Sequence, residues 1–79
     1  MEERTNVYEK IVECLTNMLG DKGYSESTAF ADLGMKSVNY SSMINVLEDE
    51  FDVEIPFMEF RRKASIGDAA DYICQLIDG

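Results

Sequence analysis

The feature that most constrains the fold of this chain is a helical repeat of apolar residues that starts soon after a glycine and a serine, Gly34 and Ser37. Apolar side chains recur every three or four residues with polar residues between them, which is typical of an amphipathic helix. The pattern predicts a helix over Ser37–Phe51, roughly 20 Å long at about 1.5 Å per residue. Its buried side is predicted to comprise Met43, Ile44, Leu47 and Phe51, with Tyr40 as a further candidate.

Ser37 stands at the start of this predicted helix, as an N-cap or first-turn residue. Backbone N–H groups there have no partner within the helix, and the helix dipole adds partial positive charge. A phosphate joined to the Ser37 oxygen would therefore be stabilised, which makes Ser37 a candidate modification site. The alternative is that Ser37 only caps the helix. Gly34 is predicted to let the backbone turn tightly or approach a ligand closely.

A second apolar repeat predicts a helix from about Thr5 to Leu19, with Gly20 as the residue that follows its end. Asn6 and Glu9 have the spacing of a capping box, which leaves the start of this helix open. The repeat indicates a face that packs on a core and suggests no chemistry. Its buried stripe is predicted to be Val7, Ile11, Cys14, Leu15 and Met18.

A long loop is predicted over residues 20–36, where glycine, serine and aspartate interrupt the helical pattern. One short turn is expected around Ala29–Asp32. A structureless loop of this length is unusual in a small domain, so apolar residues should hold it against the helices. Tyr24, Phe30 and Leu33 are predicted to do so.

Two more helices are predicted after the turn-rich linker Asp52–Pro56. A short one should cover Phe57–Lys63, and a longer one should start near Ser65, with Asp68 at capping-box spacing. Together the segments predict an all-α fold, a small four-helix bundle with three main helices and one short helix. The buried stripe of the last helix is predicted to be Ile66, Ala69, Ala70, Ile73, Leu76 and Ile77.

The net charge of −9, from seven basic and sixteen acidic side chains, excludes a nucleic-acid-binding protein, which needs a basic face. It favours partner proteins with basic surfaces, although acidity can also serve only solubility. Histidine is absent from the 79 residues, so the commonest general base near neutral pH is missing and independent catalysis is not expected.

Cys14 and Cys74 form no metal-ligand pattern and fall within apolar stripes, so we expect reduced core thiols in a cytoplasmic protein. A disulfide between them is the alternative. No apolar run is long enough to span a membrane, and the N-terminal residues lack the apolar core of a signal peptide. We therefore expect a cytoplasmic monomer without membrane insertion, folded as a single domain over residues 1–79.

The order and spacing of several short motifs resemble those of the acyl carrier protein family across nearly the whole chain. The family carries 4′-phosphopantetheine on the serine of an Asp-Ser-Leu-like motif, and Ser37 takes that position here. The resemblance implies that the thiol of this group holds acyl intermediates as thioesters for enzymes of fatty-acid, polyketide or related biosynthesis. The motifs that carry it are Asp32-Leu33-Gly34, Leu47 to Asp52, Glu54-Ile55-Pro56, Ile66 to Ala69 and Asp71-Tyr72-Ile73.

The resemblance also implies roles for the residues around Ser37. Ser37 is the implied attachment residue, and the implied partners are a phosphopantetheinyl transferase and acyl- or aminoacyl-loading ligases or synthases with basic docking surfaces. Two further cofactor-binding residues are expected from their own chemistry: Gly34 positions the backbone before Ser37, and the charge of Lys36 pairs weakly with the phosphodiester. An acyl pocket is implied near Phe57, Met58 and Phe60, which could equally fill the core. The partner-binding face of the helix is implied to comprise Val38, Ser42, Asn45, Glu48 and Asp49.

The chain departs from the family pattern where the family is usually acidic. Lys36 replaces the usual aspartate before the serine, Asn39 and Ser42 are uncharged, and acids return only at Glu48. We interpret the chain as a specialised carrier with its own partners, with neutral drift as the alternative. The basic run 61–63 is interpreted as a solvated face, or alternatively as a contact for an anionic partner or cargo.

Other functions remain open from the sequence alone. A peptidyl or aminoacyl carrier, including a D-alanyl carrier, would share the fold and the serine. An unmodified adaptor with the carrier fold is a hypothesis from a different class, since the transferase could read position 36. An enzyme is the least favoured class, because both cysteines lie in apolar stripes where thiolates are disfavoured.

Overall fold

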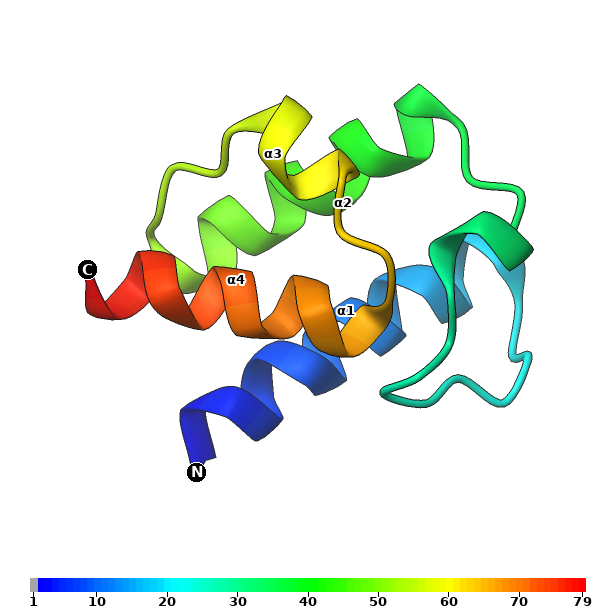
Figure 1. Ribbon diagram of the computed structural model, residues 1–79, viewed down its shortest axis with the longest axis horizontal. Helices are drawn as coiled ribbons and strands as arrows, with labels where there is room; N and C mark the ends of the chain where they lie inside the picture. Colours follow the sequence, from blue (N-terminus) through cyan, green and yellow to red (C-terminus); the bar gives the residue numbers. More distant parts are fainter. Residues whose placement is uncertain (1) are drawn as a thin grey trace.

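The computed structural model describes residues 2–79 and confirms an all-α fold, a small bundle of four α-helices in this part of the chain (Figure 1). The helix Ser37–Phe51 has the bounds predicted for it. The long loop and the start of this helix lie together, at the end of the molecule away from both termini (Figure 1). The elements are α1 Glu2–Leu19, the 3₁₀ turn η1 Phe30–Asp32, α2 Ser37–Phe51, α3 Phe57–Arg61 and α4 Ile66–Asp78.

The first helix starts earlier than predicted, at Glu2 instead of Thr5. The capping-box prediction for Asn6 and Glu9 is wrong, because both residues lie inside the helix. Its end is as predicted: the N–H of Gly20 donates to the carbonyl of Thr16 at 2.9 Å, and the φ of +91° at Gly20 suits a residue without a β-carbon.

The core lies where α1 packs against α2 and α4, and α3 packs against α2. The residues predicted to form the buried stripes of α1, α2 and α4 are buried, with four exceptions near the helix ends. Met18, Phe51, Leu76 and Ile77 are only half-buried. Burial of apolar surface of this kind is the main force that holds a bundle together. The fully or nearly fully buried residues are Val7, Ile11, Cys14, Leu15, Phe30, Tyr40, Met43, Ile44, Leu47, Ile55, Phe60, Ile66, Ala69, Ala70 and Ile73.

The long loop is ordered by backbone hydrogen bonds to the segment that joins α3 to α4. The N–H of Phe30 donates to the carbonyl of Ala64 at 3.0 Å, and the N–H of Ile66 donates to that of Thr28 at 3.0 Å. The predicted short turn is present as η1, and the three predicted anchors are confirmed, since Phe30 is buried and Tyr24 and Leu33 pack on the core.

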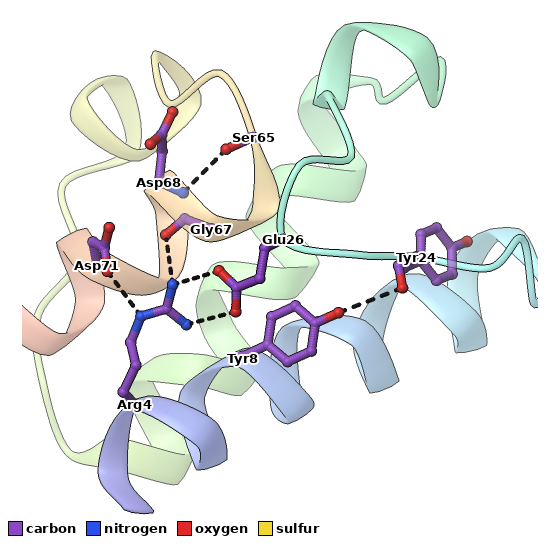
Figure 2. Close-up of polar contacts among 8 residues, drawn as sticks. All are labelled: Arg4, Tyr8, Tyr24, Glu26, Ser65, Gly67, Asp68 and Asp71. Atoms are coloured by element: carbon purple, nitrogen blue, oxygen red, sulfur yellow. Dashed lines mark hydrogen bonds and ion pairs between the residues drawn. The ribbon is translucent and has the colours of Figure 1, made fainter. Parts of the chain in front are cut away.

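Arg4 reinforces this attachment from α1 (Figure 2). Its guanidinium binds both carboxylate oxygens of Glu26 at 2.6 and 3.1 Å, Asp71 at 2.8 Å and the carbonyl of Gly67 at 3.2 Å. The N–H of Gly67 in turn donates to the carbonyl of Glu26 at 2.9 Å. These four residues, the Arg4 cluster, connect α1, the loop and the start of α4.

The last two helices differ little from their predictions. Helix α3 ends at Arg61, earlier than the predicted Lys63. Helix α4 has Ser65 as its N-cap, and the Ser65 hydroxyl accepts a hydrogen bond from the N–H of Asp68 at 3.2 Å, as the capping-box spacing predicted. The connection between the two helices is therefore short, and this cap fixes its end.

Candidate functional site

The start of α2 presents Ser37 at its first helical position. Lys36 is the N-cap residue, and its carbonyl accepts hydrogen bonds from the N–H groups of Asn39 at 2.9 Å and Tyr40 at 3.2 Å. Of the two positions that the sequence left open for Ser37, the structure selects the first turn. Its side chain is exposed. The hydroxyl is thus not used as a helix cap, which leaves it free for modification.

Asn39 closes the start of α2 in a way that sequence reasoning missed. Its side-chain oxygen accepts a hydrogen bond from the N–H of Lys36 at 2.9 Å, and its amide group lies 3.8 Å from the sulfur of Met18 on α1. In a full capping box the N-cap side chain also accepts a hydrogen bond from a backbone N–H. The ammonium of Lys36 can only donate, so this second bond is not made. The signal for this role was present, because Asn39 lies three residues after the N-cap, where capping-box partners occur.

Gly34 sets the direction in which the chain enters α2. Its φ is +67°, in the left-handed region that favours glycine. A β-carbon placed there would meet nothing within 4 Å. Of the two predicted reasons for a glycine, the positive φ supports the tight turn, and the close approach to a ligand stays a prediction.

A cluster of three buried aromatic rings packs against the core side of the first turns of α2. The ring of Tyr40 packs edge-on against Phe30 at 5.7 Å and against Phe60 at 6.3 Å, measured between ring centroids. The guanidinium of Arg61 lies over the Tyr40 ring at 5.4 Å. Burial raises the pKa of the Tyr40 hydroxyl, while the charge of Arg61 opposes this rise. Contacts from η1 and α3 to Tyr40 therefore fix the first turn of α2, which carries Ser37.

The three residues expected at an acyl pocket lie in different environments. Phe60 is fully buried in the aromatic cluster, Phe57 is half-buried and Met58 is 59% exposed. None of them lines the hollow that opens between α1 and α2. Phe60 therefore fills the core, which was the alternative interpretation of these residues.

The outer face of α2 is exposed along its length. Val38 is 65% exposed, and Ser42, Asn45 and Asp49 are exposed with it. Glu48 differs from the other residues expected on this face. It is half-buried, and its carboxylate accepts a hydrogen bond from the N–H of Ile55 at 2.8 Å, so it fixes the linker after α2.

A hollow of about 230 Å³ opens between α1 and α2, and nothing in the sequence predicted it. Its lining is mostly apolar. Cys14 on α1 lies 7% exposed in its wall, and burial raises the pKa of the Cys14 thiol. The other lining residues are Asn17 and Met18 on α1, and Ser42, Met43 and Val46 on α2, with Glu13 at the rim.

The residues at the start of α2 fit a covalently attached phosphate. The hydroxyl of Ser37 is exposed, and within residues 2–79 the N–H groups of Ser37 and Val38 have no hydrogen-bond partner in the chain. These N–H groups and the helix dipole favour an anion there. Residues 2–79 gather no three metal-ligating side chains, and no helix in this range is long and apolar enough to cross a membrane.

Comparisons with known proteins agree with this geometry. A family model described as the phosphopantetheine attachment site matches residues 9–73. The chain is 36% identical over 70 residues to the acyl carrier protein of Clostridium acetobutylicum, covering 85% of this chain and 91% of that protein. Its fold is similar to the crystal structure of an acyl carrier protein from Thermotoga maritima, with a TM-score of 0.76, 24% identity, and coverage of 96% and 92% of the two chains.

Proposed function

This chain belongs to the acyl carrier protein family, and from that premise we propose that it carries acyl groups on a 4′-phosphopantetheine attached to Ser37. The observation that carries the proposal is the exposed Ser37 hydroxyl at the first position of α2, within the region matched as a phosphopantetheine attachment site. The bound group supplies a thiol that holds the cargo as a thioester.

The chain's own residues position and expose the attachment point. Gly34 turns the backbone into α2, and Asn39 and the carbonyl of Lys36 close the first turn. The N–H groups of Ser37 and Val38, which have no hydrogen-bond partner within residues 2–79, would stabilise a phosphate on the Ser37 oxygen. No acid–base chemistry by the chain is required, because the transferase and the loading enzymes supply it. We therefore propose a carrier without catalytic activity of its own.

The proposal extends to partners and setting. The carrier meets a phosphopantetheinyl transferase and loading ligases or synthases, and its net charge of −9 favours approach to enzymes with basic surfaces. Residues 1–79 form one carrier domain, which acts as a cytoplasmic monomer. Lys36 and the uncharged first half of α2 support a specialised member with its own partner set, in fatty-acid, polyketide or related biosynthesis.

The test is the intact mass of the purified protein after incubation with coenzyme A and a broad-specificity phosphopantetheinyl transferase. The unaltered protein is expected to gain one phosphopantetheine, and Ser37→Ala is expected to gain none. Ser41→Ala, an exposed serine one turn further along α2, is the matched control and should be modified as the unaltered protein is.

Absence of any mass gain would contradict modification by this class of transferase. The Lys36→Asp variant then separates the remaining hypotheses, because it restores the residue usual in the family before the serine. A gain in this variant alone would indicate a dedicated transferase. No gain in either protein would favour an unmodified adaptor. Among modified outcomes, the ligase or synthase that loads the thiol distinguishes an acyl carrier from an aminoacyl or D-alanyl carrier.

A further inference from the structure

The structure divides the basic run 61–63 between two helices. Arg62 and Lys63 line a separate hollow of about 400 Å³ beside α4. The guanidinium of Arg61 lies instead over the ring of Tyr40 on α2, 5.4 Å from the ring centroid. Arg61 is the last residue of α3, which packs against α2 (Figure 1). It is thus the cation of this run that contacts the helix carrying Ser37.

The contact with Tyr40 places Arg61 beside the first turn of α2. Tyr40 follows Ser37 by three residues, so the two residues lie on one face of the helix with their β-carbons about 5–6 Å apart. The Tyr40 ring is 6% exposed and is fixed by its contacts with Phe30 and Phe60. Arg61 itself is exposed, so its side chain can turn from the ring toward Ser37 without disturbing the core.

The charge of Arg61 is not neutralised by a carboxylate of the described chain. Arg4 and Lys10 each bind two carboxylates. Arg61 has no ion pair within residues 2–79, and residues 37–47 of α2 contain no acidic side chain. In a chain with sixteen acidic and seven basic side chains, this guanidinium therefore stays available to an anion from outside the fold.

We infer that Arg61 binds the phosphodiester of the group attached to Ser37 and holds it on the side of α2 that faces α3. The inference rests on the proposed function, which places a permanent negative charge at Ser37. A guanidinium offers a phosphate two parallel N–H donors, and such a bond is stronger than its contact with an exposed aromatic ring. The unpaired N–H groups of Ser37 and Val38 provide further donors from α2. The start of the arm is thereby less mobile than a group held by its serine alone.

The test follows the Arg61 side chain in protein without and with phosphopantetheine, each state being confirmed by intact mass. In nuclear magnetic resonance spectra the Nε–H signal of Arg61, identified by its loss in Arg61→Gln, is expected to shift when the group is attached. Exchange of this proton with solvent should slow by about tenfold, because a hydrogen bond to a charged acceptor protects it. The Nε–H signal of Arg62, assigned with Arg62→Gln, is the matched control and should change by less than about twofold.

A thermodynamic cycle measures the same contact independently. Attachment of the group is expected to raise the ratio of folded to unfolded protein more in the unaltered protein than in Arg61→Gln, by about two- to fivefold, the range of an exposed ion pair. Urea denaturation of the four proteins gives this difference. The unmodified Arg61→Gln protein corrects for the lost contact with Tyr40, and Arg62→Gln should leave the gain unchanged.

Other outcomes overturn the inference. If attachment leaves the Arg61 signal unchanged, the phosphate is not bound there. If Arg62→Gln reduces the gain as much as Arg61→Gln, general positive charge acts and no single residue binds the phosphate. If Lys36→Gln abolishes the gain while Arg61→Gln keeps it, the phosphate binds Lys36 instead. An unaltered protein that gains no phosphopantetheine contradicts the proposed function itself, whereas a modified protein without the Arg61 response contradicts this inference alone.

Discussion

The Arg4 cluster and the Ser37 end, defined as residues 34–40, use their polar groups in opposite ways. In the Arg4 cluster the charged groups bind one another, and the two carboxylates at the guanidinium raise the pKa of Arg4. At the Ser37 end the serine hydroxyl and two backbone N–H groups have no partner within residues 2–79. The first region fixes the loop to α4, whereas the polar groups of the second are left without a partner in this part of the chain, as the proposed attachment requires.

The difference explains why a long loop can support a precise attachment point. The loop is fixed at its middle by the Arg4 cluster and at its end by the buried ring of Phe30. Between Phe30 and Ser37 the side chains of Leu33 and Met35 pack on the core, and Gly34 and Asn39 define the backbone at the start of α2. At this exposed end the N–H groups of Ser37 and Val38, which have no partner within residues 2–79, are available to a ligand.

The largest predicted effect removes the support beneath the Ser37 end. Phe60→Ala deletes a fully buried ring from the aromatic cluster and is expected to lower the free energy of unfolding by about 3–5 kcal/mol, measured by urea denaturation. Met58→Ala, on the same short helix but 59% exposed, should stay within about 0.5 kcal/mol of the unaltered protein. Equal effects of the two changes would show that the cluster does not support α2.

The next effect disturbs the Arg4 cluster. A β-carbon on Gly67 would lie 2.7 Å from a carboxylate oxygen and 2.9 Å from the carbonyl oxygen of Glu26. Gly67→Ala is therefore expected to destabilise the protein by about 2 kcal/mol, although alanine favours a helix over glycine by about 1 kcal/mol. Gln75→Ala, exposed on the same helix, is the control for propensity. A stabilised Gly67→Ala protein would contradict close packing of the loop on α4.

A smaller effect is predicted for the residue that closes α2. Asn39→Ala removes the acceptor for the Lys36 N–H and is expected to lower stability by about 1 kcal/mol in the same denaturation experiment. Asn39→Asp keeps an acceptor and adds a negative charge near the helix start, so it should be at least as stable as the unaltered protein. A destabilised Asn39→Asp protein together with an unchanged Asn39→Ala protein would show that this hydrogen bond does not close the helix.

The smallest effect concerns pH. Burial raises the pKa of Cys14 above its ordinary value of 9.0, so the folded protein holds this proton more tightly than the unfolded chain. The resulting stability is fully present below the unfolded value and is lost as pH rises through the folded value. The urea concentration at the midpoint of unfolding should therefore decrease as the pH rises above about 9. The decrease should be smaller in the Cys14→Ala variant. An alkaline decline that Cys14→Ala leaves unchanged would assign it to other groups, such as Tyr40, whose pKa burial also raises.

The sequence predicted what depends on local periodicity. The bounds of α2, the short turn in the loop and the Ser65 cap follow from apolar spacing and cap chemistry, and all are confirmed. The start of α1 was misplaced because its first turn lacks apolar residues at helical spacing, while Arg4 anchors that turn to Glu26 and Asp71, far away in the sequence. Pairing over such distances leaves no periodic signal.

The candidate site was predictable only in part for the same reason. The exposure of Ser37 follows from its place before an apolar repeat, whereas the hydrogen bond of Glu48 to Ile55 depends on how the linker folds back. The hollow between α1 and α2 depends on which side chains of two helices fail to meet, and no single helix pattern contains that information. The family model and the relative from Clostridium acetobutylicum support carrier function, while the position of the attachment remains a prediction.

The most direct test of the central claim locates the added group along the chain. After incubation with transferase and coenzyme A, the protein is digested and the modified peptide is fragmented in a mass spectrometer that resolves Ser37 from Ser41 and Ser42. The account predicts the phosphopantetheine on Ser37 alone. A group found on Ser41, on Ser42 or on a residue outside α2 would contradict the assignment of the Ser37 end as the attachment site.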